Sequence, residues 1–235
     1  MKYLIACDLD GSLLNKQGQL TEKTIQVLNK LRKDGHIVVL ATGRPFEGAI
    51  PKYQQIGLDT ALITDNGGSI TNPTDTSFAT QKTYLPLPIV HELFKNTKQY
   101  IVSAFFSENH VVYAYKYDKK LEEYFSGMSS ENIVECEFSD LTIAPTGLVY
   151  LIDSQYMDAL EKYVDSALGD TLSHRLWGVD NGYALYEIYL KHISKSSALN
   201  YLLDYYGMKK EQLIAFGDGI NDVEMIRDAH LGVAM

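Results

Sequence analysis

The feature that most constrains the fold of this chain is a short apolar run that recurs along the sequence and ends each time in a polar turn. Such runs occupy residues 3–7, 36–41 and 60–64, and helical patterns near 21–35 and 46–56 follow the first two. Three units of strand, turn and helix in succession predict a parallel sheet with right-handed crossovers. Sheets of this kind bind ligands beyond the carboxyl ends of their strands, and we expect a site there.

From about residue 82 the pattern changes to strands that follow one another, with a helical segment at 155–168. The segments YIVSAFFSENHVVYAYKY, PTGLVYLID and YALYEIYL predict strands of an α+β unit. We therefore expect an inserted domain over 83–188 and a first domain built from 1–82 and 189–235. Within the latter, QLIAFGDGINDVEMIRDA restores the pattern of strand, turn and helix, and HLGVAM predicts one more buried strand.

Carboxylates follow two of the predicted core strands, at Asp8, Asp10, Asp218 and Asp222. If those strands are neighbours, the carboxylates converge and repel one another unless a cation joins them. Oxygen ligands without nearby His or Cys favour Mg2+, which keeps coordination positions for water or a substrate phosphate. An Asp after a strand is also a common turn residue, and Asp10 alone fits that interpretation equally well. D-x-D-G and G-D-G-x-N-D after two separate strands together favour phosphoryl chemistry.

Net charge, apolar runs and cysteine content limit the classes of binding partner and the cellular location that we expect. The formal net charge of -9 argues against a nucleic-acid binder that needs a basic face, but it is compatible with a small phosphate ester. No apolar run approaches the length of a membrane span, and the first residues lead directly into a strand, so we expect no membrane partner and a cytoplasmic location. The two cysteines, Cys7 and Cys136, form no C-x-x-C pair, which fits a reducing compartment.

Other phosphate and metal motifs do not match. A cysteine phosphatase needs C-x5-R, but Leu13 stands six residues after Cys7. The sixth position of a dinucleotide fingerprint at GDGIND is Asp222 in place of glycine. A calcium loop starting at Asp8 would also need glycine at position 13.

Four motifs in order, DLDGSLL, ATGR, the lysine of ISKSSAL and GDGINDVEM, resemble those of the haloacid dehalogenase-like (HAD) superfamily in its Cof-type sugar-phosphatase branch. The resemblance implies the α/β fold class, with a Rossmann-like parallel-sheet core and an α+β cap domain inserted between the second and third motifs. The branch continues past GVAM with a further strand and helix, so we expect the C-terminal end of the core to be truncated.

The resemblance also implies roles for single residues. Asp8 would be the nucleophile that forms an aspartyl-phosphate, and Asp10 would protonate the leaving alcohol and then activate water. Mg2+ would be held by the carboxylates of Asp8 and Asp218, by the backbone carbonyl of Asp10, and indirectly by Asp222. The transferring phosphoryl group would contact the Leu9 N-H, Thr42, the Gly43 amide, Lys195 and Asn221.

Several points stay open. Asn66 in TDNGG resembles a turn that approaches the substrate, although an asparagine tolerated in a tight turn explains it equally well. Lys195 alone would be interpreted as a solvated residue in a first helical turn, and nearby departures from the branch pattern at Leu190, His192 and Ser196 predict a differently shaped loop. Because alternate strand residues face the same side, Leu9 is interpreted as a spacer that lets Asp8 and Asp10 point together.

The sequence thus predicts a Mg2+-dependent phosphatase of small phosphate monoesters, with sugar phosphates expected as substrates. A phosphomutase that uses the same D-x-D pair, or a non-catalytic sugar-phosphate-binding protein, remains an alternative. The expected partner is a small phosphorylated metabolite, and the expected assembly is a monomer or a small homo-oligomer.

Overall fold

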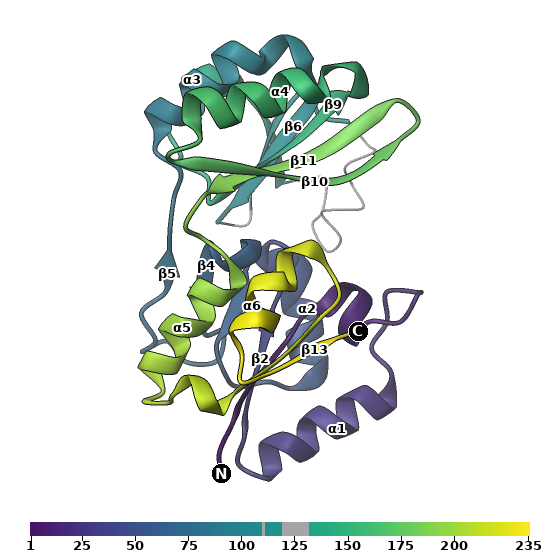
Figure 1. Ribbon diagram of the computed structural model, residues 1–235, viewed down its shortest axis with the longest axis vertical. Helices are drawn as coiled ribbons and strands as arrows, with labels where there is room; N and C mark the ends of the chain where they lie inside the picture. Colours follow the sequence, from purple (N-terminus) through teal and green to yellow (C-terminus); the bar gives the residue numbers. More distant parts are fainter. Residues whose placement is uncertain (110, 119–131) are drawn as a thin grey trace. The chain divides into compact units, whose positions relative to one another are not determined.

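A computed structural model describes residues 1–109, 111–118 and 132–235. The chain divides into two compact units, one made of Met1–Lys82 with Ile193–Met235 and the other of Thr83–His192 (Figure 1). The second junction follows His192, whereas the sequence pattern predicts a boundary at 188. That the second unit acts as a cap remains a proposal.

The first unit is built on a seven-stranded sheet with the order β13-β12-β1-β2-β3-β4-β5. Neighbouring strands from β13 through β3 are parallel, which confirms the predicted α/β class with a parallel sheet. The strands are β1 (Leu4–Cys7), β2 (Ile37–Ala41), β3 (Leu62–Thr64), β4 (Ser69–Thr71), β5 (Gln81–Lys82), β12 (Leu213–Gly217) and β13 (Leu231–Ala234).

The prediction that a helix follows the third strand and its turn is wrong. After β3 the chain does not enter a helix but reverses into β4, which pairs antiparallel with β3. Three consecutive residues of the turn, Asp65, Asn66 and Gly67, have positive φ angles of 50°, 53° and 103°. Asn, Asp and Gly tolerate this left-handed backbone, so the DNGG sequence makes a tight reversal in place of a helix start.

Helices cover both faces of this sheet, and they are α1 (Glu22–Lys33), α2 (Phe46–Ile56), α5 (Lys195–Tyr205) and α6 (Val223–Asp228). One core cluster contains Leu4 of β1 with Leu199 of α5, and the other contains Ile5 with Leu28 of α1 and Tyr53 of α2. Successive residues of β1 therefore enter opposite cores. This explains why the strand is apolar throughout.

The last strand differs from its prediction. The segment HLGVAM contains β13, but most of this strand is exposed, and Leu231 is 51% exposed. The reason is its place in the sheet, since β13 is an edge strand and, among the described residues, pairs only with β12.

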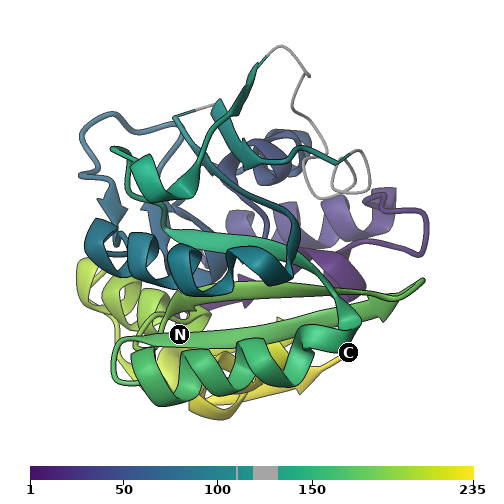
Figure 2. The ribbon, with the colours of Figure 1, turned by 90° about the horizontal axis from the view of Figure 1, so that it is seen from above.

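The second unit has a six-stranded sheet with the order β10-β11-β9-β6-β7-β8, and α3 and α4 lie side by side on one of its faces (Figures 1 and 2). The predicted helix at 155–168 corresponds to α4 followed by a further helical turn at Val164–Leu168. The sequence patterns do not predict α3 or β10. Strand β10 is a largely exposed edge strand without a clear alternation. The elements are α3 (Leu87–Thr97), β6 (Ile101–Glu108), β7 (Val111–Tyr115), β8 (Ile133–Glu135), β9 (Gly147–Asp153), α4 (Met157–Tyr163), β10 (Leu172–Asp180) and β11 (Tyr183–Leu190).

None of the helices in the described parts of either unit has the length and apolar character that a bilayer crossing requires.

Candidate active site

The sheet brings the two acidic motifs together. Strands β1 and β12 are parallel neighbours in which Cys7 lies opposite Phe216, so the condition under which the carboxylates converge is met. The Asp8 N-H donates a hydrogen bond of 3.0 Å to the Phe216 carbonyl, which extends the ladder to the last residue before the turn. Asp8 and Asp218 therefore leave the same edge of the sheet side by side.

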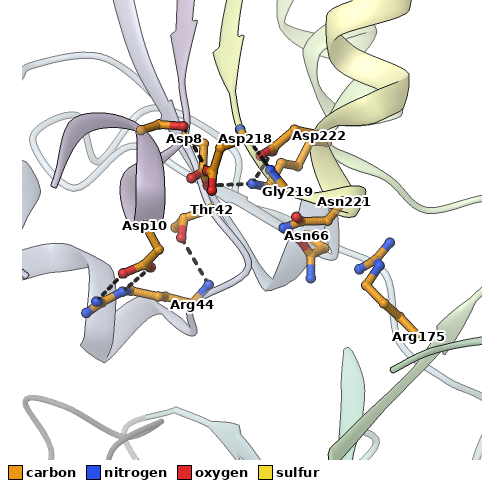
Figure 3. Close-up of polar contacts among 12 residues, drawn as sticks. Asp8, Asp10, Thr42, Arg44, Asn66, Arg175, Asp218, Gly219, Asn221 and Asp222 are labelled. Atoms are coloured by element: carbon orange, nitrogen blue, oxygen red, sulfur yellow. Dashed lines mark hydrogen bonds and ion pairs between the residues drawn. The ribbon is translucent and has the colours of Figure 1, made fainter. Parts of the chain in front are cut away.

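Three carboxylates form a cluster at this edge. One oxygen each from Asp8, Asp218 and Asp222 lies within 4.8 Å of the others (Figure 3). Asp8 and Asp222 are 4% and 1% exposed, whereas Asp218 is exposed. Buried negative charges at this separation repel unless positive charge compensates them, and a donor set made only of oxygen suits a hard divalent cation. The residues present therefore fit Mg2+.

Lys195 supplies positive charge from the protein itself. Its Nζ lies 2.6 Å from Asp8 Oδ1 and 2.6 Å from Asp222 Oδ1, and its side chain is fully buried. Lys195 is the first residue of α5, whose N-terminus is capped by Ser194 through a reciprocal pair of hydrogen bonds with Ser197. The interpretation of this lysine as a solvated surface residue is therefore wrong, because the helix start directs its side chain into the acidic cluster.

The turn after β3 approaches the start of α5 closely. A Cβ atom on Gly67 would lie 2.3 Å from the Ser194 carbonyl oxygen, and the φ angle of Gly67 is 103°. Only glycine fits both the space and the backbone conformation. The DNGG turn thus allows α5 to begin where Lys195 can reach Asp8.

The ionisation of Asp8 is perturbed. Burial raises the pKa of the Asp8 carboxyl from 3.8 to about 6, and the negative charge of Asp222 acts in the same direction. The Lys195 ammonium and the Leu9 N-H oppose this shift because both stabilise the charged form. Asp8 consequently remains largely ionised at neutral pH, although its pKa lies much closer to neutrality than that of an exposed aspartate.

Asp222 organises the loop after β12. Its Oδ2 accepts hydrogen bonds of 3.0 Å from the backbone N-H groups of Asp218 and Gly219, while its Oδ1 faces Lys195. A Cβ on Gly217 would lie 2.5 Å from the Asp222 side chain, so this loop is tightly packed. Asp222 therefore supports the position of Asp218 as well as contributing charge.

Asp218 also contacts the loop after β1. The Ser12 hydroxyl lies 3.1 Å from Asp218 Oδ1, and a Cβ on Gly11 would lie 1.9 Å from Asp218 Oδ2. Gly11 has a φ angle of 77°. The glycine of the D-x-D-G motif thus makes room for the carboxylate of the second acidic motif.

Besides Leu9 and Lys195, the residues that the sequence assigns to phosphoryl or substrate binding lie in three loops. The Asn221 side-chain amide donates a hydrogen bond of 2.9 Å to Asn66 Oδ1, and the Asn66 N-H donates to the Thr42 carbonyl at 3.1 Å. A Cβ on Gly43 would lie 3.0 Å from the Asn66 side chain. The loops that follow β2, β3 and β12 therefore meet beside the acidic cluster (Figure 3). Asn66 is both a residue of a tight turn and a member of this group.

Strand alternation predicts that the side chains of Asp10 and Asp8 point to the same side, but in the structure they do not. It lies beyond β1, in a helical turn at Leu9–Leu13 whose backbone is non-helical at Asp10 and Gly11. Its carboxylate is not part of the acidic cluster and instead turns toward Arg44 (Figure 3). The Arg44 Nε and Nη2 donate hydrogen bonds of 2.7 Å to Asp10 Oδ2 and Oδ1.

Arg44 is a site residue that sequence analysis missed. The available signal was its position in ATGR, directly after the strand end that carries Thr42. The Asp10 carboxylate raises the pKa of the Arg44 guanidinium above its ordinary value.

The chain matches known proteins over nearly all of its length. The family model for haloacid dehalogenase-like hydrolases matches residues 5–235, and the chain belongs to this family. A Bacillus subtilis relative, 5-amino-6-(5-phospho-D-ribitylamino)uracil phosphatase YitU, is 33% identical over 99% of this chain and 86% of its own length. A putative phosphatase of Metamycoplasma hominis is 29% identical over 99% of this chain and 85% of its own length. The chain is accordingly an enzyme, a hydrolase of the phosphatase type that these relatives represent.

Solved structures show the same fold. A haloacid dehalogenase-like hydrolase from Bacteroides thetaiotaomicron superposes with a TM-score of 0.84 at 25% identity, covering all of this chain and 88% of the other. A sugar phosphatase of HAD subclass IIB superposes with a TM-score of 0.80 at 22% identity, covering 99% of this chain and 87% of the other.

Proposed function

We propose that this chain is a Mg2+-dependent phosphatase that hydrolyses small phosphate monoesters through an aspartyl-phosphate on Asp8. The observation that carries the proposal is the environment of Asp8, which is buried, contacts Lys195 at 2.6 Å, and shares the acidic cluster with Asp218 and Asp222. A buried carboxylate beside fixed positive charge is suited to attack a phosphoryl group, because the surrounding charges offset the repulsion between two anions.

In the first half of the reaction, a carboxylate oxygen of Asp8 bonds to phosphorus while the bond from phosphorus to the ester oxygen breaks. Lys195 contacts Oδ1 of Asp8, so the second oxygen is the one assigned to attack. Asp10 gives a proton to the leaving oxygen, which departs as an alcohol. In the second half, Asp10 takes a proton from water as the water oxygen bonds to phosphorus, and Asp8 is released with inorganic phosphate.

Mg2+ would be held by the carboxylates of Asp8 and Asp218, with the Asp10 backbone carbonyl as a further ligand and Asp222 acting on the loop around it. When bound, the ion would offset negative charge on the cluster and on the phosphoryl group. The fit of the three carboxylates to an oxygen-binding cation supports this assignment.

The transferring phosphoryl group would be contacted by the Thr42 hydroxyl, the amides of Leu9 and Gly43, and the side chains of Lys195 and Asn221. Asn66 would act mainly by orienting Asn221, because the two side chains are hydrogen bonded at 2.9 Å. Lys195 would shift part of its interaction from the carboxylates to the phosphoryl oxygens. Fixed donors of this kind stabilise charge that is spread over those oxygens in the transition state.

The substrate class is a small phosphorylated metabolite. The Bacillus subtilis relative is named for 5-amino-6-(5-phospho-D-ribitylamino)uracil, and this compound is the first metabolite to test. Another relative, from Serratia proteamaculans, is named for HMP-PP, so the named substrates of relatives differ. Sugar phosphates complete the panel. Hydrolysis is favoured over phosphomutase activity because these relatives are named as phosphatases.

The test is a phosphate-release assay with p-nitrophenyl phosphate and the metabolite panel, run with Mg2+ and with EDTA. We expect Mg2+-dependent turnover that falls at least about 1,000-fold in Asp8→Asn, because the nucleophile is lost. Asp204→Asn is the matched control, since Asp204 is an exposed carboxylate on α5 outside the cluster. Turnover that persists in Asp8→Asn, or that is equal in Mg2+ and EDTA, would refute the proposal.

A further inference from the structure

The starting point is the ion pair between Asp10 and Arg44, which the proposed roles of the other residues leave unexplained. Both Asp10 oxygens accept hydrogen bonds of 2.7 Å from the guanidinium group, one from Nε and one from Nη2. A forked pair of this type fixes the plane and the direction of a carboxylate, which a single bond to an ammonium group does not.

Arg44 is itself held at two further points. Its backbone N-H donates to the Thr42 hydroxyl at 3.1 Å, and its Nη1 donates to the Gly48 carbonyl in the first turns of α2 at 3.3 Å. Its side chain is 23% exposed. The guanidinium group is thus anchored to the loop between β2 and α2, and it can transmit that position to Asp10.

Asp10 lacks comparable anchors of its own. It lies between β1 and Gly11, in a turn with non-helical backbone, and 56% of its side chain is exposed. Among the described residues, Arg44 is the hydrogen-bond partner of its carboxylate. Without that partner, the side chain would be free to occupy several rotamers.

Arg44 holds the Asp10 carboxylate in a direction that suits a general acid for the leaving oxygen. In phosphoryl transfer the attacking and leaving oxygens lie roughly in line on opposite sides of phosphorus. A group that protonates the leaving oxygen must therefore lie apart from the carboxylates gathered around the nucleophile. Asp10 lies outside the cluster of Asp8, Asp218 and Asp222 and turns away from it (Figure 3).

We propose that Arg44 is a positioning residue that holds the Asp10 carboxylate on the leaving-group side of the phosphoryl group. The bidentate pair occupies one lone pair on each Asp10 oxygen, and the second lone pair can carry the proton that passes to the leaving oxygen or accept one from water. Arg44 acts through Asp10 and does not itself bind the phosphoryl group. This inference rests on the proposed function, because it assumes that Asp10 transfers the proton.

The test compares two esters that differ in their need for an acid. An aryl ester such as p-nitrophenyl phosphate has a stable leaving anion, whereas an alkyl ester such as glycerol phosphate must be protonated as it leaves. In Arg44→Gln we expect kcat/KM for the alkyl ester to fall about 100-fold, since misplacing a catalytic group by about 1 Å has a cost of that order. For the aryl ester we expect a fall of less than about threefold, because its leaving group needs little general acid catalysis.

Arg32→Gln is a matched control, since Arg32 pairs with Asp59 at 2.8 Å and its side chain is 21% exposed. It should leave both esters unchanged. Arg44→Lys should restore only part of the alkyl-ester activity, because an ammonium group cannot form the fork. In the background of Asp10→Asn, the further change Arg44→Gln should lower alkyl-ester activity by less than about threefold, as expected for residues that act as one unit.

Equal losses for the two esters in folded Arg44→Gln, or a rise in KM of equal size for both, would overturn the proposal, since either result would indicate direct phosphate binding or a general structural effect. Additive losses in the double variant would overturn it as well. These outcomes differ from a failure of the proposed function, which would appear in the unmodified chain as turnover independent of Mg2+ or in Asp8→Asn as retained activity.

Discussion

Lys195 Nζ lies 2.6 Å from Asp8 Oδ1, although the two residues are 187 positions apart in the sequence. The same ammonium group lies 2.6 Å from Asp222 Oδ1. One buried lysine therefore compensates two buried carboxylates. This arrangement makes the site a source of catalytic charge and also a sensitive point for stability.

Replacing Lys195 by Met leaves Asp8 and Asp222 buried without their cation. We expect the free energy of unfolding of the metal-free protein to fall by about 3 kcal/mol at neutral pH, the usual cost of breaking a buried pair. Phosphatase activity should fall at least about 100-fold through the loss of a fixed charge beside the phosphoryl group. Urea denaturation and a phosphate-release assay test these effects. An unchanged unfolding midpoint would contradict the assigned ion pairs.

The raised pKa of Asp8 predicts a dependence of stability on pH in metal-free protein. Because the folded state holds this proton more tightly than the unfolded state, the contribution to stability is present below pH 3.8 and is lost as pH rises through about 6. Asn cannot ionise, so Asp8→Asn avoids the cost of a buried charge. At pH 7.5 its free energy of unfolding should therefore exceed that of the unmodified chain by at most about 3 kcal/mol.

The measurement is urea denaturation in EDTA at pH 5 and pH 7.5. The advantage of Asp8→Asn should be smaller at pH 5, where Asp8 is largely protonated. Asp204→Asn, which alters an exposed carboxylate, should show no such change between the two pH values. A difference between Asp8→Asn and the unmodified chain that is the same at both pH values, or that has the opposite sign, would refute the pKa shift.

Mg2+ binding to the acidic cluster should stabilise the folded chain. At a concentration of about 100 times Kd, a ligand that binds only the folded state adds about 2.7 kcal/mol. Asp218→Asn should abolish most of this gain with little effect on metal-free stability, because Asp218 is the exposed member of the cluster. Thermal unfolding with and without Mg2+ tests this effect, and a gain that survives in Asp218→Asn would place the ion elsewhere.

Two glycines with similar backbone angles allow a controlled test of the site geometry. Gly11 and Gly18 have φ angles of 77° and 68°, but a Cβ on Gly11 would lie 1.9 Å from Asp218 Oδ2, whereas nothing lies within 4 Å of one on Gly18. Gly18→Ala should lower the free energy of unfolding by about 1 to 2 kcal/mol, because only backbone strain is added. Gly11→Ala should lower the free energy of unfolding by more than Gly18→Ala does. It should also reduce the rise in unfolding temperature that Mg2+ produces. Equal effects of the two substitutions would argue against the close packing of Gly11 on Asp218.

The parts of the site that the sequence could predict are those fixed by strand order. Asp8 and Asp218 follow directly on strands whose apolar character predicts burial, and the two carboxylates converge because the sheet places these strands side by side. Strand order does not determine the position of Lys195. Its burial depends on the Ser194 cap and on the approach of Gly67 to the start of α5. The motif order indicated this lysine, although its local sequence did not.

The orientation of Asp10 could not be predicted in the same way. The alternation rule holds only within a strand, and β1 ends at Cys7, before the D-x-D-G turn. The direction of the Asp10 side chain is set by a partner from another loop, Arg44, which no local pattern connects to it. The same limit explains the exposed edge strand β13, because burial depends on neighbouring elements as well as on apolar residues.

The role of Asp8 as the nucleophile is tested most directly by trapping the covalent intermediate. The chain is mixed with a phosphate ester labelled at phosphorus in the presence of Mg2+, quenched in acid during turnover, and mapped by peptide mass spectrometry. We expect a phosphoryl group on the peptide that contains Asp8, removable by hydroxylamine and absent from Asp8→Asn. An active enzyme that carries no phosphoryl group, or carries it on another residue, would refute Asp8 as the nucleophile.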